Sequence, residues 1–137
     1  MLFRSFQESY DFIAALPFSY LHIFPFSPRP GTQGWELHRQ SPVRGQALQE
    51  RLAALRLLIR EKSHSFRAAF TGKVLPAITL NAAENADAGD GTPGMTDNFL
   101  PLHIDTTLPS NRMLSVLASG IGSRGELICE VATPAFA

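Results

Sequence analysis

Residues 16–32 have the sequence LPFSYLHIFPFSPRPGT, which combines a short apolar run with a rigid loop. The run from about Phe18 to Phe26 is rich in strand-forming residues and is bounded by turn residues, so it predicts a strand. Apolar residues on both faces suit a strand buried in a parallel sheet. Pro28 and Pro30 fix φ in the loop that follows, and Gly31 allows conformations that other residues avoid. Loops at the carboxyl ends of such strands hold the functional residues of barrel enzymes.

The residues before this stretch predict a helix. Apolar side chains recur with helical spacing between Ser5 and Leu16, Ser5 and Glu8 have the spacing of a capping box, and Pro17 ends the pattern. A helix followed by a strand is the repeating unit of parallel barrels. We therefore expect residues 1–32 to form one helix–strand unit.

The middle of the chain, residues 33–70, predicts a loop and one long helix. The polar segment from Gln33 to Ser41 predicts a loop, and Pro42 precedes a helical pattern from about Val43 to Phe70. Gly72 then ends the helix. Its apolar stripe consists of Leu48, Leu52, Leu55, Ile59, Phe66 and Phe70. Its cations are Arg44, Arg51, Arg56, Arg60, Lys62 and Arg67, against only Glu50 and Glu61.

Residues 71–137 change to the two-residue period of strands. The expected strands are Val74–Leu80, Asn98–Thr106, Arg112–Ala118 and Gly125–Val131. Within the second of these, Pro101 implies an edge strand or a bulge. A loop is expected from Asn81 to Gly94, a turn at Leu108–Asn111 and a frayed tail over residues 133–137. Short strands with turns at this spacing predict a small antiparallel barrel, which makes the whole chain α+β in class.

Composition places the chain among globular proteins. Hydrophobic residues make up 45% of its 137 residues and charged residues 18%, which excludes a disordered chain. No apolar run reaches the roughly 18 residues that cross a membrane, and no signal-peptide core is present, so we expect a cytoplasmic protein without a membrane partner. Residues 1–70 carry nine Lys and Arg against five Asp and Glu, and residues 71–137 carry three against seven. Basic surface, which nucleic acids require, therefore belongs to the N-terminal half.

Four segments in order resemble one enzyme family. They are LPFSYLHIFPFSPRPGT at 16–32, QERLAAL at 49–55, FTGKVL at 70–75 and GMTDNFL at 94–100. Together they resemble the C-terminal part of the radical-SAM methylthiotransferases of the MiaB and MtaB type, and most closely the MtaB-like branch that modifies threonylcarbamoyladenosine in tRNA. The likeness covers residues 5–131. Because the cysteines of such enzymes are absent, the resemblance implies a C-terminal fragment.

The resemblance implies a role for each part of the chain. Residues 1–32 would be the last helix and strand of a truncated radical-SAM barrel, residues 33–70 the connecting loop and long helix, and residues 71–137 a TRAM-like β-barrel. Enzymes of this family hold 4Fe-4S clusters through cysteines and bind S-adenosylmethionine. Cys129 is the only cysteine here, so we expect this chain alone to bind neither cofactor.

The predicted strand has no parallel partner within the chain, so it needs cover. Self-association through Tyr20–Phe26 is the first possibility, and pairing with the missing N-terminal part of the enzyme is the second. The remaining possibilities are that the segment packs on the long helix or that it is poorly ordered.

Two groups of candidate site residues follow. By the resemblance, the loop after the strand faces the active-site mouth. Its candidates are Ser27, Arg29 and Thr32, and the alternative is a turn with a solvated arginine. The RNA-binding candidates are Arg51, Arg56, Arg60, Lys62, Arg67, Lys73, Thr96, Asn98 and Arg112. A basic helix face contacts a tRNA backbone or is simply solvated, and the turn at residues 96–98 is structural or RNA-facing.

Other chemistry-bearing residues favour structural roles. His22 is expected to be a core histidine and Cys129 a small buried apolar residue. Phe99 is a stacking platform for a base or, alternatively, a core or edge aromatic. No metal-ligand spacing links Cys129 to the other histidines, so we predict no metal site. The acidic residues of the 81–94 loop lack the spacing of a calcium site and indicate a solvated loop.

The sequence leaves three functions open. The first is the C-terminal part of a tRNA-modifying enzyme, in which this chain recognises tRNA and does not catalyse methylthiolation of a modified adenosine next to the anticodon. The second is a free-standing RNA-binding module, and the third is an inactive gene remnant. A ribosomal-protein methylthiotransferase is the alternative parent enzyme. Salt-dependent tRNA binding separates the RNA-binding module from the remnant.

Overall fold

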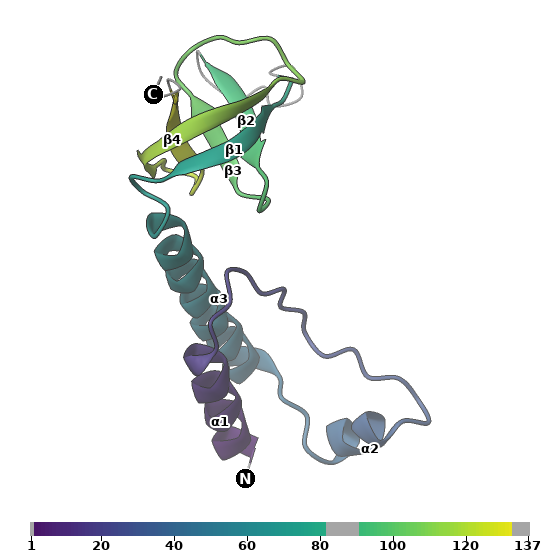
Figure 1. Cartoon of the computed structure of the whole chain (residues 1–137). Coiled ribbons are helices and arrows are strands. Elements are labelled where there is room, and N and C mark those ends of the chain that lie inside the picture. Colours follow the sequence, from purple (N-terminus) through teal and green to yellow (C-terminus); the bar gives the residue numbers. More distant parts are fainter. Residues whose placement is uncertain (1, 82–90, 133–137) are drawn as a thin grey trace. The chain divides into compact units, whose positions relative to one another are not determined.

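The computed structural model describes residues 2–81 and 91–132. The chain divides into two compact units, Met1–Ser63 and His64–Ala137, and the boundary falls within the longest helix. Figure 1 shows that the first unit is helical and that the strands belong to the second. The expected frayed tail at 133–137 lies outside the described residues.

Within the described residues the helices are α1 (Leu2–Ala15), α2 (Gln33–Gln40) and α3 (Gly45–Ala68). Helix α1 confirms the helix predicted before Pro17, and α3 confirms the long helix. The expected stripe of α3 buries Leu52 and Ile59, and Leu58 is buried beside them. Gly72 follows α3 with a φ of 82°, the left-handed conformation that commonly ends helices at glycine. None of these described helices is long and apolar enough to span a bilayer.

The segment Gln33–Ser41, predicted to be a loop, contains helix α2. Thr32 is its N-cap, with an extended backbone and a hydroxyl oxygen that accepts a hydrogen bond from the Trp35 amide at 3.2 Å. Glu36 places a negative charge in the first turn, where the helix dipole favours it. The loop prediction was wrong because it followed polar composition and overlooked this cap, which stabilises a helix start by about 1 kcal/mol.

Residues 18–26 form no strand, contrary to the prediction (Figure 1). A strand requires a hydrogen-bonded neighbour, and the described residues of the first unit contain no other strand that could supply one. The segment instead leaves Tyr20, Phe24 and Phe26 exposed, at 58%, 79% and 61%. His22 is exposed as well, with ring centroids 4.7 Å from Tyr20 and 6.2 Å from Phe24. Its predicted core position was wrong because the strand that would have buried it does not form.

The described residues of the second unit form a closed five-stranded barrel (Figure 1). The strands are β1 (Val74–Thr79), β2 (Thr92–Thr96), β3 (Pro101–Ile104), β4 (Met113–Ile121) and β5 (Leu127–Val131). Their order around the barrel is β1-β2-β3-β5-β4. This confirms the α+β class and the small TRAM-like barrel after a helix. One detail differs, because β3 and β5 pair in parallel where only antiparallel pairs were expected.

Strand β2 lies largely where a loop was predicted, at Asn81–Gly94; residues 82–90 of that loop are outside the described residues. The sequence of β2, TPGMT, has little intrinsic strand preference. Pairing with β1 on one side and β3 on the other determines its conformation. Gly94 permits this close fit, because a Cβ there would lie 2.8 Å from both the Ile78 carbonyl oxygen and Leu102 Cδ1.

Pro101 was expected on an edge strand or at a bulge, and this was wrong. It is the first residue of β3 and pairs with Met95 of β2 in the closed barrel. A first strand position tolerates proline because little hydrogen bonding is lost there.

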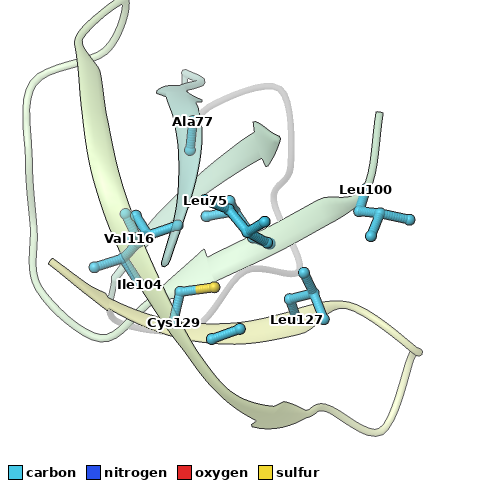
Figure 2. Close-up of a cluster of buried hydrophobic side chains, with 9 residues drawn as sticks. Leu75, Ala77, Leu100, Ile104, Val116, Leu127 and Cys129 are labelled. Atoms are coloured by element: carbon cyan, nitrogen blue, oxygen red, sulfur yellow. The ribbon is translucent and has the colours of Figure 1, made fainter. Parts of the chain in front are cut away.

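Alternating side chains from β1, β3, β4 and β5, together with the residue before β3, fill the barrel (Figure 2). The core residues are Leu75, Ala77, Leu100, Leu102, Ile104, Val116, Ala118, Leu127 and Cys129. Cys129 is fully buried, as predicted. The buried hydroxyls are satisfied: Thr79 donates to the Pro109 carbonyl and Thr92 to the Thr106 carbonyl, each at 2.7 Å.

Candidate nucleic-acid interface

The basic side chains of α3 fall on two faces of the helix. Arg51 and Lys62 lie about 20° apart around the helix axis, whereas Arg56 lies about 140° from Arg51. The Arg51 guanidinium is 5.0 Å from the centroid of the Phe6 ring. Lys62 Nζ donates a hydrogen bond of 2.7 Å to the Leu16 carbonyl. These two half-buried cations therefore pack against the N-terminal segment of the first unit.

Arg56 and Arg60 form the second face. They are one helical turn apart and both are exposed. Among the cations within α3 itself, these two are the exposed ones.

Arg67 is occupied within the second unit. Its Nη1 donates a hydrogen bond of 2.7 Å to the carbonyl of Gly125, in the turn between β4 and β5. Its Nε is buried and has no hydrogen-bond partner among the described residues. Arg67 thus joins the end of α3 to the barrel and has limited freedom to contact RNA.

The three active-site-loop candidates, which lie in the loop before α2, have different surroundings. The Thr32 hydroxyl donates to the Arg29 carbonyl at 2.8 Å and accepts from the Trp35 amide, so its polar atoms form the helix cap. The side chains of Ser27 and Arg29 are exposed.

The turn at residues 96–98 is built by one buried hydroxyl. Thr96 Oγ1 donates to Asn98 Oδ1 at 2.6 Å and accepts from the Leu100 amide at 2.9 Å. Asn98 is exposed, and Phe99 beyond it is 81% exposed with a φ of 62°. Phe99 is therefore neither a core nor a buried edge aromatic, and its ring face is available for stacking.

The barrel brings some of its predicted RNA-binding residues together and separates others. Lys73 precedes β1, and its Nζ lies 5.4 Å from the Phe70 ring centroid. The Asp97 amide bonds to the Pro76 carbonyl, so the 96–98 turn lies beside the first half of β1. Arg112 instead exchanges hydrogen bonds with Thr79 at the other end of β1. Six residues of strand span about 20 Å, so Arg112 lies away from Lys73 and the turn.

Sequence reasoning missed a pocket of ≈ 270 Å³ on the outer face of β2 and β3, here called the β2–β3 pocket. Two cross-strand pairs form its floor, Pro93 opposite His103 and Met95 opposite Pro101. The pocket is lined by Leu80, Pro93, Gly94, Met95, Pro101, Leu102, His103, Arg124 and Glu126. Only the parallel pairing of β3 with β5 brings the last two residues beside β3, and that pairing had no signal in the sequence.

The polar wall of the β2–β3 pocket is the connection between β4 and β5. The Glu126 carboxylate accepts a hydrogen bond from the Arg124 amide at 3.0 Å, and its side chain is 18% exposed. The Arg124 side chain is 56% exposed, with Nε 3.9 Å from Glu126 Oε1. Gly122 makes room for this arrangement, because a Cβ there would collide with the carboxylate. An acceptor held in place and an exposed cation thus border an apolar floor.

The chain is similar in sequence to known tRNA methylthiotransferases. The chain is 39% identical over 77 residues to the threonylcarbamoyladenosine tRNA methylthiotransferase MtaB of Aquifex aeolicus and 30% identical over 97 residues to the MtaB of Bacillus subtilis. It is 31% identical over 117 residues to the tRNA-2-methylthio-N(6)-dimethylallyladenosine synthase of Anaplasma phagocytophilum. These matches cover 56%, 71% and 82% of this chain. The chain belongs to the tRNA methylthiotransferase family.

The chain spans only part of these methylthiotransferases: 18%, 21% and 26% of the lengths of the three relatives. No family model matches it. The sequence resemblance to the MtaB and MiaB type is confirmed, and the activity of a whole methylthiotransferase does not follow for this chain.

The residues of the chain do not fit the cofactors that the methylthiotransferase resemblance implies. A 4Fe-4S cluster requires several cysteine thiolates. This chain has the single thiol of Cys129, which is buried in the barrel core. Burial raises its pKa from 9.0 to about 11, which disfavours the thiolate that a metal requires. The described residues also contain no group of three or more His, Cys, Asp or Glu placed to hold a metal ion.

Proposed function

We propose that this chain recognises tRNA for a methylthiotransferase and that the chemical reaction takes place elsewhere in the enzyme. The substrate would be a tRNA whose modified adenosine, next to the anticodon, receives a methylthio group. The observation that supports recognition is the closed barrel with the order β1-β2-β3-β5-β4, an architecture that binds oligonucleotides in many proteins. We also propose a cytoplasmic location, because tRNA is the partner.

The absence of catalysis in this chain is part of the proposal. The iron–sulfur clusters and S-adenosylmethionine of the parent enzyme would be bound by residues outside this sequence, because one buried thiol cannot replace a set of cysteine ligands. Ser27 and Arg29, exposed in the loop before α2, are proposed to face the reaction site of such an enzyme. Thr32 would position that loop through its helix cap.

Electrostatic contact with the tRNA backbone is proposed for Arg56 and Arg60, the exposed pair on α3. Lys73 and Asn98 are proposed to extend contact onto the barrel, near the first half of β1. Arg51, Lys62 and Arg67 contribute less in this view, since each already contacts another part of its own unit.

A salt titration of tRNA binding tests the proposal. The whole chain should bind unmodified tRNA in a fluorescence anisotropy assay, with log K falling as log salt concentration rises. The double variant Arg56→Gln, Arg60→Gln should bind more weakly at low salt and show a slope smaller by roughly 1 to 2. The matched control is Arg39→Gln, Arg44→Gln, which removes two exposed arginines that are not proposed contacts. No tRNA binding by the unaltered chain, or equal losses in both double variants, would contradict the proposal.

The exposed segment at residues 18–26 is proposed to pair with another polypeptide, first a second copy of this chain. Its backbone lacks a strand neighbour and its aromatic side chains are exposed, which favours β-pairing between chains. Sedimentation should detect a concentration-dependent dimer that Phe24→Asp weakens. An unaltered chain that stays monomeric at high concentration would exclude self-association and leave pairing with the remainder of the enzyme.

A further inference from the structure

The β2–β3 pocket has the size and chemistry to hold one base. We propose that it binds a single unpaired nucleotide of RNA, with the base on the pocket floor and its polar edge toward Glu126. This inference rests on the proposed function, because it names the part of the tRNA that the barrel would take.

The position of the pocket on the barrel supports this assignment. Five-stranded barrels of the oligonucleotide-binding kind use the face of strands 2 and 3, with the loop between strands 4 and 5, to bind single strands. The floor of this pocket comes from β2 and β3, and its polar wall comes from the β4–β5 connection. The pocket therefore lies on the same face of the barrel, and beside the same loop, that bind nucleotides in such barrels.

The floor suits the flat face of a base. Pro93, Met95 and Pro101 are apolar side chains on the two paired strands. The His103 side chain is only 16% exposed, and Gly91 lies so close that a Cβ there would collide with Nε2, so the ring is held in place. Phe99 is two residues before Pro101 and 81% exposed. A neighbouring base could stack on this ring, which typically contributes about 1–3 kcal/mol per base.

The wall selects among bases. The Glu126 carboxylate is an acceptor only, and the Arg124 amide fixes its orientation. Adenine and cytosine each present an amino group that can donate to this acceptor. The one donor on the pairing edge of uracil, N3–H, lies between two carbonyl oxygens, which repel a carboxylate. The exposed Arg124 guanidinium is placed to contact the phosphate of the same nucleotide.

The charge of the barrel favours an unpaired nucleotide over a duplex. Residues 71–137 carry three Lys and Arg against seven Asp and Glu, so this part of the chain repels a dense array of phosphates. A duplex offers mainly its backbone, because its bases are paired and stacked. A base held by stacking and by hydrogen bonds to its edge needs few phosphate contacts. We therefore expect the pocket to bind a base that is unpaired and turned out of the stack.

The test uses the whole chain and short labelled RNAs in anisotropy titrations: hexamers of A, C and U, and a duplex of mixed sequence. We expect the A and C hexamers to bind at least threefold more tightly than the U hexamer, and the duplex to bind most weakly. Arg124→Met should weaken hexamer binding about tenfold, equivalent to roughly 1.4 kcal/mol. Glu126→Gln, which keeps an oxygen for the Arg124 amide, should bring the three hexamers within twofold of one another. The control Arg44→Met removes an exposed cation of the first unit that is not a proposed RNA contact, and it should change affinity less than twofold.

The outcomes separate this inference from the function on which it rests. If tRNA binds but hexamers do not, or if Glu126→Gln leaves the base preference unchanged, the pocket assignment is overturned and tRNA recognition stands. If the Arg44 and Arg124 variants lose affinity equally, binding is by net charge and the pocket assignment is again overturned. Loss of all binding to tRNA and hexamers alike would overturn both proposals.

Discussion

Arg67 and Gly125 show, at the scale of single residues, how a cation that resembles an RNA contact can serve the fold. The Arg67 guanidinium reaches the Gly125 carbonyl, and Gly125 has a φ of 87°. A side chain at position 125 would meet two penalties. It would be strained in this conformation, and its Cβ would lie 2.5 Å from Arg67 Nη1.

The substitution Gly125→Ala should therefore lower the free energy of unfolding by about 1–2 kcal/mol from the backbone strain alone, with a further loss from the clash. Urea unfolding would measure it. Gly120→Ala is the control, because a Cβ there meets nothing within 4 Å and Gly120 has no left-handed φ. In an Arg67→Ala background the clash is removed, so the cost of Gly125→Ala should shrink toward the strain term. An unchanged cost there would contradict the clash.

Cys129 gives a prediction about pH. Its burial raises the thiol pKa from 9.0 to about 11, so the unfolded chain releases this proton first. Below pH 9 both states keep the proton, and between pH 9 and 11 the unfolded state is favoured progressively, so the free energy of unfolding falls across this window. Urea midpoints of the unaltered chain and of Cys129→Ala, measured through this range, should converge as pH rises. Parallel curves would show that the thiol does not contribute.

At the scale of elements, the sequence allowed α1, α3 and most strands to be predicted, because each has its own periodic pattern. Two elements were missed because their conformation depends on contacts and not on a periodic pattern of their own. Helix α2 depends on the single cap at Thr32, and β2 depends on burial between β1 and β3. The predicted strand at residues 18–26 failed for the opposite reason, since its pattern is strong and the described residues of its unit offer no partner strand.

Strand β2 should accordingly be intolerant of added volume. Gly94→Ala would place a methyl group against the Ile78 carbonyl and the Leu102 side chain and is expected to cost about 1–3 kcal/mol. Thermal unfolding compared with Gly120→Ala measures the difference. A Gly94→Ala variant as stable as that control would mean that β1 and β3 can separate without loss of packing.

At the scale of the whole molecule, the types of residue at the candidate site could be predicted from the sequence. Which of these residues lie close together in space could not. Helical geometry places the α3 cations on two faces, and contacts engage Arg51, Lys62 and Arg67. The β2–β3 pocket, by contrast, draws residues from four separate segments. Only the strand order brings Glu126 beside Pro101, so no local pattern could have indicated it.

Two compact units in one chain imply two unfolding events, and the chain has a separate probe for each. Trp35, the only tryptophan, lies in the first unit, and Cys129, the only cysteine, lies in the barrel core. Leu52→Ala removes a buried side chain from the first unit and Leu127→Ala one from the barrel. Each should cost about 2–5 kcal/mol.

In urea, Leu52→Ala should move the midpoint seen by Trp35 fluorescence and leave the midpoint for thiol labelling of Cys129 in place. Leu127→Ala should do the reverse. This follows because each unit has its own buried apolar residues, the condition for independent cooperative unfolding. If either variant moved both midpoints equally, α3, which spans the boundary at Ser63, would couple the two units into a single cooperative structure.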